Sequence, residues 1–137
     1  MSERAPVGLL DTCVLIDIES VPDSNLPVIS QVCAVTVAEL MMGVHMAKQP
    51  LQRSARITKL LSVNANFDPL PFNGPALDAF NALVGYTVAI GRNPKPRKND
   101  LMIAATAVAN GLPLYTANIE DFKGLESMLE VIGVQAA

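Results

Sequence analysis

Short apolar segments alternate with helix-length segments along this chain, and this alternation constrains the fold most. The segments at 6–10, 29–35, 112–116 and 129–134 are predicted to be buried strands. Predicted helices follow at 11–20, 36–49, 50–64, 74–91 and 99–111. Strands that alternate with helices favour a parallel sheet covered by helices. We therefore expect an α/β fold with a central, mostly parallel sheet.

The composition favours one soluble domain over residues 1–137. Half of the residues are hydrophobic and only 4% are aromatic, so the core must be aliphatic. The start of the chain lacks a secretory signal, and no window is apolar enough to span a membrane. Cys13 and Cys33 lack metal-ligand spacing and are predicted to be free core residues. A reduced, cytoplasmic location is expected.

Acidic side chains recur where strands end and helices begin. Asp11 ends the first strand, Glu39 lies near the start of the second helix, and Asp100 opens the apolar segment "LMIAATAVAN". Asn118 and Asp121 follow the strand "LPLYT". In a parallel sheet these positions share one edge, which is where ligands bind. The sequence therefore predicts that they form one cluster.

A cluster of carboxylates needs a counter-charge, because like charges repel and burial disfavours ionisation. Helix N-termini supply only about 0.3–1 kcal/mol each. An all-oxygen ligand set suits Mg²⁺ or Mn²⁺ better than zinc. Such ions bind phosphates, and a pair of them can act on a phosphodiester.

Each acid also has a simpler interpretation. "TVAE" has the spacing of a capping box, so Glu39 could only cap a helix. Asp11 could be the N-cap of "TCVLI", and Asp100 a first-turn residue behind the predicted N-cap Asn99. Taken singly, the capping reading of Glu39 is about even with a ligand role, and the simpler readings of Asp11 and Asp100 are the better ones, but the coincidence of all the acids at one edge favours a site.

A basic strip precedes Asp100. The net charge of −3 argues against a protein that binds nucleic acid over its whole surface. The strip could be an ordinary solvated loop, or it could hold a polyanionic backbone beside the acids. We favour RNA binding by Arg92, Lys95, Arg97 and Lys98.

Three segments resemble the motifs of PIN-domain nucleases, specifically the VapC-type toxins of bacterial toxin–antitoxin pairs. They are "LLDTCVLID", "TVAELMMGV" and "NDLMIAATAVANGLPLYTANIEDF", which occur in family order. The third is the most specific, because a long stretch matches in residue type and spacing. The resemblance spans nearly the whole chain and implies a PIN-domain fold.

The resemblance also implies site residues. Asp11, Glu39 and Asp100 match the three core metal-ligating acids of the family. Asp121 is assigned to the fourth acidic position, with Asn118 as a helper. Two further positions match polar residues that support the acids, Thr12 and Thr116. Cys13 replaces a more usual serine or asparagine, which puts hydrogen-bond support at that position in doubt.

The implied activity is that of a Mg²⁺- or Mn²⁺-dependent endoribonuclease that leaves 5′-phosphate and 3′-hydroxyl ends. The implied partner is a VapB-like antitoxin, whose apolar helix would occupy a groove formed by residues 36–62 and cover the acids. The toxin is expected to form a homodimer through the helix that starts near Pro75. It would contact operator DNA only through the antitoxin.

Rival functions fit the residues less well. Acyl-phosphate chemistry of the dehalogenase type needs a second aspartate two residues after Asp11, where this chain has Cys13. Receiver-domain and cysteine-phosphatase patterns are missing, and so is a glycine-rich phosphate loop. A catalytically silent PIN-fold binding module is the remaining alternative. It predicts loss of a core acid, and none is lost.

Overall fold

The computed structural model describes residues 4–135 and consists of one sheet with helices on both faces. The sheet is formed by β1 (Val7–Leu10), β2 (Ile29–Gln31), β3 (Leu114–Thr116) and β4 (Val131–Gly133). The strand order is β2-β1-β3-β4 and every pairing is parallel. The predicted α/β architecture is therefore confirmed.

Five α-helices connect the strands. They are α1 (Thr12–Ile16), α2 (Ala34–Met46), α3 (Pro50–Asn66), α4 (Gly74–Ala89) and α5 (Lys98–Ala109). Short 3₁₀ turns lie at η1 (Ile18–Ser20), η2 (Asp23–Asn25), η3 (Lys95–Arg97) and η4 (Ile119–Phe122). None of the helices within residues 4–135 is long and apolar enough to cross a membrane.

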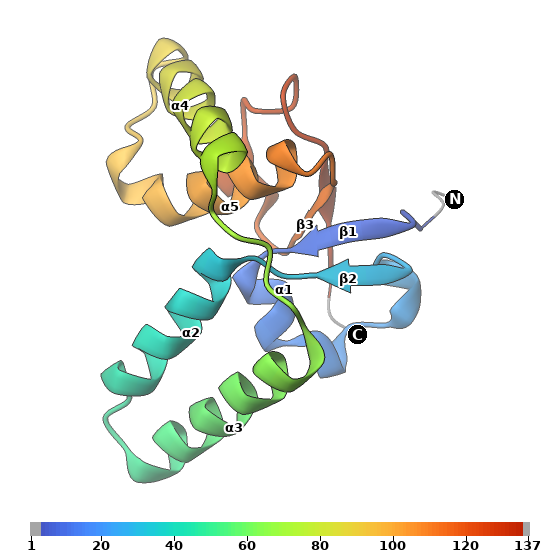
Figure 1. Cartoon of the computed structure of the whole chain (residues 1–137), viewed down its shortest axis with the longest axis vertical. Coiled ribbons are helices and arrows are strands. Elements are labelled where there is room, and N and C mark those ends of the chain that lie inside the picture. The colour runs from blue at the N-terminus through green and yellow to red at the C-terminus, as the bar shows by residue number, and fades with distance from the viewer. Residues whose placement is uncertain (1–3, 136–137) are drawn as a thin grey trace.

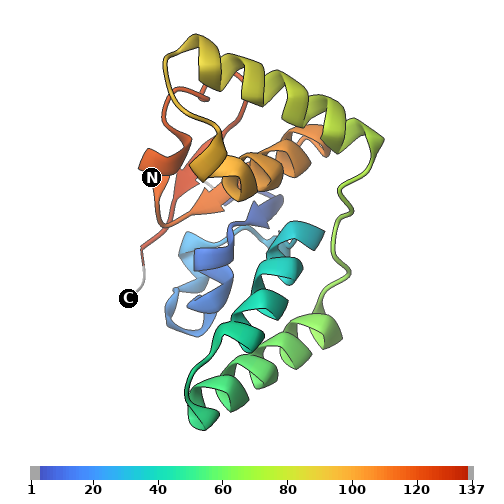
Figure 2. The same cartoon turned by 90° about the vertical axis from the view of Figure 1, so that its left-hand side faces the viewer.

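The helices form two layers. Helices α4 and α5 pack together on one side of the sheet, and α1 lies with the α2–α3 hairpin on the other (Figure 1). Figure 2 shows the hairpin extending away from the sheet, with the segment between α3 and α4 crossing from one layer to the other. The layers bury different residues of the same strand, because successive side chains point to opposite faces. Leu9 joins the α4–α5 core, and Leu10 joins the core around α1.

Helix α5 is the central helix of the fold. Its buried residues include Leu101, Ile103 and the run Ala104–Ala107, of which the alanines at 104, 105 and 107 are completely inaccessible. Small side chains allow α4 to approach closely on one side while the sheet covers the other. Gly111 follows the helix with φ of 64°, a left-handed conformation that favours glycine. Helix α5 is therefore packed on both sides, and Asp100 lies in its first turn.

The predicted boundary between the second strand and the second helix is wrong. The second strand ends at Gln31 rather than Val35, and α2 begins at Ala34 with Cys33 as its N-cap. Cys33 still pairs with Leu70 through an isolated parallel bridge. The error arises because a short apolar run such as 32–35 has no periodicity that separates a strand from a buried helix start.

Candidate active site

Asp11 is held from several directions at the end of β1. It is the N-cap of α1, and its Oδ1 accepts a hydrogen bond from the backbone N–H of Thr12 (2.9 Å). Its Oδ2 accepts from Thr116 Oγ1 (2.8 Å) and from Cys13 Sγ (3.4 Å). Only 5% of Asp11 is exposed. The capping interpretation is thus correct, but it accounts for one of the two carboxylate oxygens only. Cys13 does support this carboxylate.

Glu39 lies one turn further along α2 than the capping-box reading requires. Because α2 begins at Ala34, Thr36 is not an N-cap and the capping box is wrong. Glu39 Oε1 instead accepts a hydrogen bond from Thr12 Oγ1 (2.6 Å) in α1. Its Oε2 accepts from Asn99 Nδ2 (3.4 Å). Asn99 was predicted as the N-cap of α5, but the helix begins at Lys98 and the amide reaches across to Glu39.

Asp100 is the electrostatic centre of the cluster. Partial burial and, in decreasing order, the charges of Asp11, Asp121 and Glu39 together raise the pKa of its carboxyl from 3.8 to about 6. Arg97 opposes this shift in the pKa. The charges of three carboxylates from other parts of the chain therefore act on Asp100. The acids that the sequence predicts to meet do meet at one edge of the sheet.

Asp121 and Asn118 differ in their relation to the cluster. Asp121, in η4, is half-buried, and its charge contributes to the raised pKa of Asp100. Asn118 is exposed and donates its backbone N–H to Thr116 Oγ1 (3.0 Å). The contact of Asn118 thus comes from its main chain and braces the threonine that supports Asp11.

The donor set fits a hard divalent ion in its chemistry. The clustered side chains supply carboxylate oxygens, with threonine hydroxyls behind them, and oxygen ligands are those that Mg²⁺ and Mn²⁺ prefer. Within residues 4–135, no three His, Cys, Asp or Glu side chains are already arranged to hold an ion. Mutual repulsion keeps carboxylates apart when no cation lies between them.

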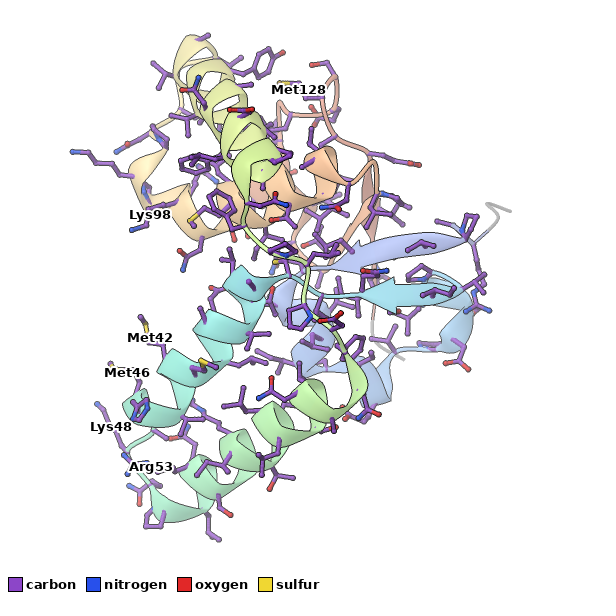
Figure 3. The ribbon with its side chains drawn as sticks, viewed as in Figure 1. Met42, Met46, Lys48, Arg53, Lys98 and Met128 are labelled. Atoms are coloured by element: carbon purple, nitrogen blue, oxygen red, sulfur yellow. The ribbon has the colours of Figure 1, made fainter. Side chains whose placement is uncertain are left out.

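The four basic residues divide into two pairs. Arg92 donates to the backbone carbonyls of Lys123 (2.7 Å) and Glu120 (3.4 Å), and Arg97 donates to that of Asp121 (3.5 Å). These arginines therefore fix the segment that carries Asp121. Lys95 and Lys98 instead line a depression of about 280 Å³ together with Glu39 and Asp100. Figure 3 shows Lys98 at the head of α5 on the same side of the molecule as Met42 of α2.

A second, larger groove adjoins the site. It has a volume of about 530 Å³ and lies between α1, α2 and α3. Ile16, Leu40 and Ala55 provide apolar lining, and Thr12 and Glu39 form the end next to the acids. Charged residues Glu19, Arg56 and Lys59 also line it. Lys59 Nζ pairs with Glu19 Oε1 at 3.1 Å.

Comparison with known proteins identifies the family. The PIN domain family matches residues 9–126. The chain belongs to the PIN-domain family. This PIN-domain protein is 34% identical over 134 residues to Ribonuclease VapC5 of Mycobacterium tuberculosis, with 96% of each chain covered. It is 29% identical over 106 residues to Ribonuclease VapC1 of Rickettsia felis, with 74% of each chain covered.

Solved structures agree with this assignment. The VapBC-5 structure from M. tuberculosis, a member of the VapBC family of toxin–antitoxin systems, matches this PIN-domain protein with a TM-score of 0.83 and 33% identity, over 94% of this chain and 99% of that one. VapBC2 of R. felis, bound to a promoter DNA fragment, matches with a TM-score of 0.73 and 21% identity over 94% and 99% of the two chains, which shows the shared fold. The predicted VapC-type PIN fold is confirmed.

Sequence reasoning did not find three residues that contact the site. Thr36, Cys33 and Asn99 all connect to Glu39, directly or through Thr12. The T-x-x-E spacing was a signal for Thr36, but it was interpreted as a cap. Asn99 was singled out for the wrong hydrogen bond.

Proposed function

We propose that this protein is the toxin of a VapBC-type toxin–antitoxin pair, an endoribonuclease that depends on Mg²⁺ or Mn²⁺ and is neutralised by a VapB-like antitoxin. The similarity to two ribonucleases named VapC and to a VapBC structure supports the activity and the partner. The gathering of the acids supports the metal dependence and carries that part of the proposal: Glu39 and Asp100 line one depression, and the charges of Asp11, Asp121 and Glu39 act on Asp100.

Asp11, Glu39, Asp100 and Asp121 are the residues that would hold the ions. When bound, Mg²⁺ or Mn²⁺ would lower the pKa of water and stabilise charge on the phosphate. Thr116 and Cys13 orient Asp11, and Thr12 orients Glu39, so that the two carboxylates are fixed before an ion arrives. Because these three side chains already hold the carboxylates, less conformational entropy is lost when an ion binds.

Lys95 and Lys98 would hold the RNA backbone. Their ammonium groups share a depression with two of the acids, where a phosphate beside the reacting one would lie. Arg92 and Arg97 would act indirectly, because their guanidinium groups are bonded to backbone carbonyls of the η4 segment. We therefore propose direct contact with the strand for the two lysines and a supporting role for the two arginines.

The antitoxin would occupy the groove between α1, α2 and α3. A helix placed there would bury Leu40 and Ile16, and its end would cover Glu39, which belongs to both the groove and the acid cluster. Contact with operator DNA would come from the antitoxin. Homodimerisation through α4 remains a prediction, supported by the exposed side chains of Leu77, Val88 and Ile90.

The alternative is a silent PIN-fold module that acts only through its partner. Such a module would keep the groove, but its function would not require carboxylates that are held in place by hydrogen bonds. The hydrogen bonds to both oxygens of Asp11 and both oxygens of Glu39 therefore favour the enzyme.

The test is cleavage of a structured-RNA pool by the free protein with Mg²⁺, with Mn²⁺ and with chelator. We expect metal-dependent cuts that carry 5′-phosphate ends. Asp100→Asn should lower the rate by at least about 100-fold, because it removes a charged oxygen ligand from the centre of the cluster.

Asp68→Asn is the matched control, since Asp68 is an exposed aspartate between α3 and α4. It should cut like the wild type. Cleavage that survives Asp100→Asn would contradict the assigned site. Antitoxin binding without cleavage by any variant would favour the silent module.

A further inference from the structure

Thr36 is a completely buried polar residue next to the acid cluster. Its side chain is inaccessible to solvent and lies in the first turn of α2. Its hydroxyl oxygen is 3.0 Å from Thr12 Oγ1 and 3.5 Å from Cys33 Sγ. The sidechain hydroxyl therefore links two neighbouring side chains rather than ending at the backbone.

The other buried helical threonines behave differently. Thr87 donates its hydroxyl to the carbonyl of Leu83 (2.7 Å), and Thr106 donates to that of Met102 (2.9 Å). Both return to a carbonyl four residues earlier, the usual solution for threonine in a helix. For Thr36 the carbonyl four residues earlier is that of Val32, which precedes the N-cap Cys33 and pairs instead with the backbone of Leu70 (2.9 Å). Thr36 is thereby directed towards Thr12.

Counting protons fixes the direction of these bonds. A threonine hydroxyl has one proton, and that of Thr12 is donated to Glu39 Oε1, since a carboxylate can only accept. Thr12 must therefore accept from Thr36, which uses the single proton of Thr36. The remaining contact then has the Cys33 thiol as donor to Thr36. The result is a one-way chain from Cys33 through Thr36 and Thr12 to Glu39.

We propose that Thr36 and Cys33 are positioning residues for Glu39, which act through Thr12 to fix one carboxylate oxygen and leave the other directed at the cation site. This inference rests on the proposed metal-dependent function. The chain joins α1 to α2, and each donated bond strengthens the next one, because polarisation in a buried chain is cooperative. Oε2 accepts from Asn99 at the head of α5, beside the depression that Glu39 shares with Asp100, and is the oxygen that we assign to the ion.

A purely structural role for Thr36 predicts something different. If its hydroxyl only satisfies hydrogen bonding in the core, Thr36→Val should lower stability and leave the affinity of the site for cations unchanged. A positioning role predicts weaker cation binding in addition to any loss of stability, because the Glu39 carboxylate would have to be ordered by the ion.

The first measurement is Mn²⁺ binding to the free, full-length protein by electron paramagnetic resonance, without RNA. We expect Thr36→Val to raise the Kd for Mn²⁺ about tenfold, in the range seen for residues behind metal ligands. Thr36→Ser, which keeps the hydroxyl, should stay within about twofold of the wild type. Cys33→Ala should have a smaller effect than Thr36→Val, since a thiol is a weak donor.

Thr87→Val is the matched control. It removes a similarly buried hydroxyl from α4 whose hydrogen bond goes to the backbone carbonyl of Leu83 and not to any residue of the chain that ends at Glu39, so it reports the loss of stability. Its Kd for Mn²⁺ should equal that of the wild type. An unchanged Kd in Thr36→Val, or a Thr36→Ser protein as impaired as Thr36→Val, would overturn the inference.

A second readout needs no metal. The hydroxyl proton of Thr12 should exchange slowly with water in the wild type and at least about tenfold faster in Thr36→Val, measured by nuclear magnetic resonance on the labelled protein. If the wild type binds no Mn²⁺ and cleaves no RNA, the proposed function fails, and this exchange rate still decides whether the chain exists. Equal rates in the two proteins would contradict the chain while leaving the nuclease intact.

Discussion

Asp100 combines two properties that oppose each other in the free protein. It lies in the first turn of a buried helix, where a carboxylate interacts favourably with the helix N-terminus. It also lies where burial and three other acids raise its pKa to about 6. In the absence of a counter-ion this residue therefore lowers the stability of the fold at neutral pH, and we infer that the position is retained for the cation site.

This conflict predicts a pH dependence of stability. The pKa of Asp100 is higher in the folded protein than its ordinary value of 3.8, so the folded state binds the proton more tightly. Below about pH 4 the group contributes nothing, and between pH 4 and 7 its contribution becomes progressively destabilising. Because Asp100 is half-exposed, we expect a loss of about 1–2 kcal/mol rather than the roughly 3 kcal/mol of a fully buried group.

Chemical denaturation with chelator present, at pH 4 and at pH 7, measures this contribution. The free energy of unfolding of the wild type should fall relative to that of Asp100→Asn as pH rises. Added Mn²⁺ should reverse the difference at pH 7. Parallel pH profiles for the two proteins would contradict the assigned environment of Asp100.

At the scale of elements, the sequence predicted the order of strands and helices better than it predicted the hydrogen-bond partners of individual side chains. The strands and the acids at their ends were predicted because hydrophobic periodicity and strand order depend on local residue patterns. The partners of Asn99, Arg92 and Thr36 were not. Each bonds to a residue at least 24 positions away except for the Thr36–Cys33 contact, and no local pattern encodes which side chain a polar group will meet.

The hairpin of α2 and α3 also carries a prediction about the antitoxin. Ala55 lies on the α3 side of the groove. Ala55→Asp should weaken binding of a cognate VapB-type antitoxin at least about tenfold, because an apolar helix would bury an unpaired carboxylate. Isothermal calorimetry measures the Kd directly.

Ala65→Asp provides the comparison for this variant. Ala65 is exposed near the end of the same helix and does not line the groove. Its antitoxin affinity should match that of the wild type. If both variants bound equally tightly, the antitoxin would have to occupy another surface.

At the scale of the whole molecule, an acidic protein must bind a polyanion. The net charge of −3 repels RNA in general, so attraction depends on a small local set of cations. Lys95 and Lys98 are the two that share a depression with the acids. Replacing both with alanine should weaken RNA binding by Asp100→Asn protein and reduce the salt dependence of log Kd by a slope of about 1.5–2.

Fluorescence anisotropy at several salt concentrations gives this slope. Arg92→Ala should change it little and should lower the melting temperature, because this arginine is bonded to the backbone of the η4 segment. If the salt dependence of log Kd fell for Arg92→Ala and stayed constant for the double lysine variant, the arginine would be the residue that contacts RNA and the lysines would not.

The strand order β2-β1-β3-β4 places residues from opposite ends of the gene product side by side. Asp11 is synthesised early, but its support from Thr116 requires β3, which joins the sheet only after α5 has been made. A growing chain on the ribosome therefore has no complete nuclease centre until nearly all of these segments have emerged. All residues that line the α2–α3 groove are translated before that point, so the chain acquires the residues of its antitoxin surface before those of its acid cluster.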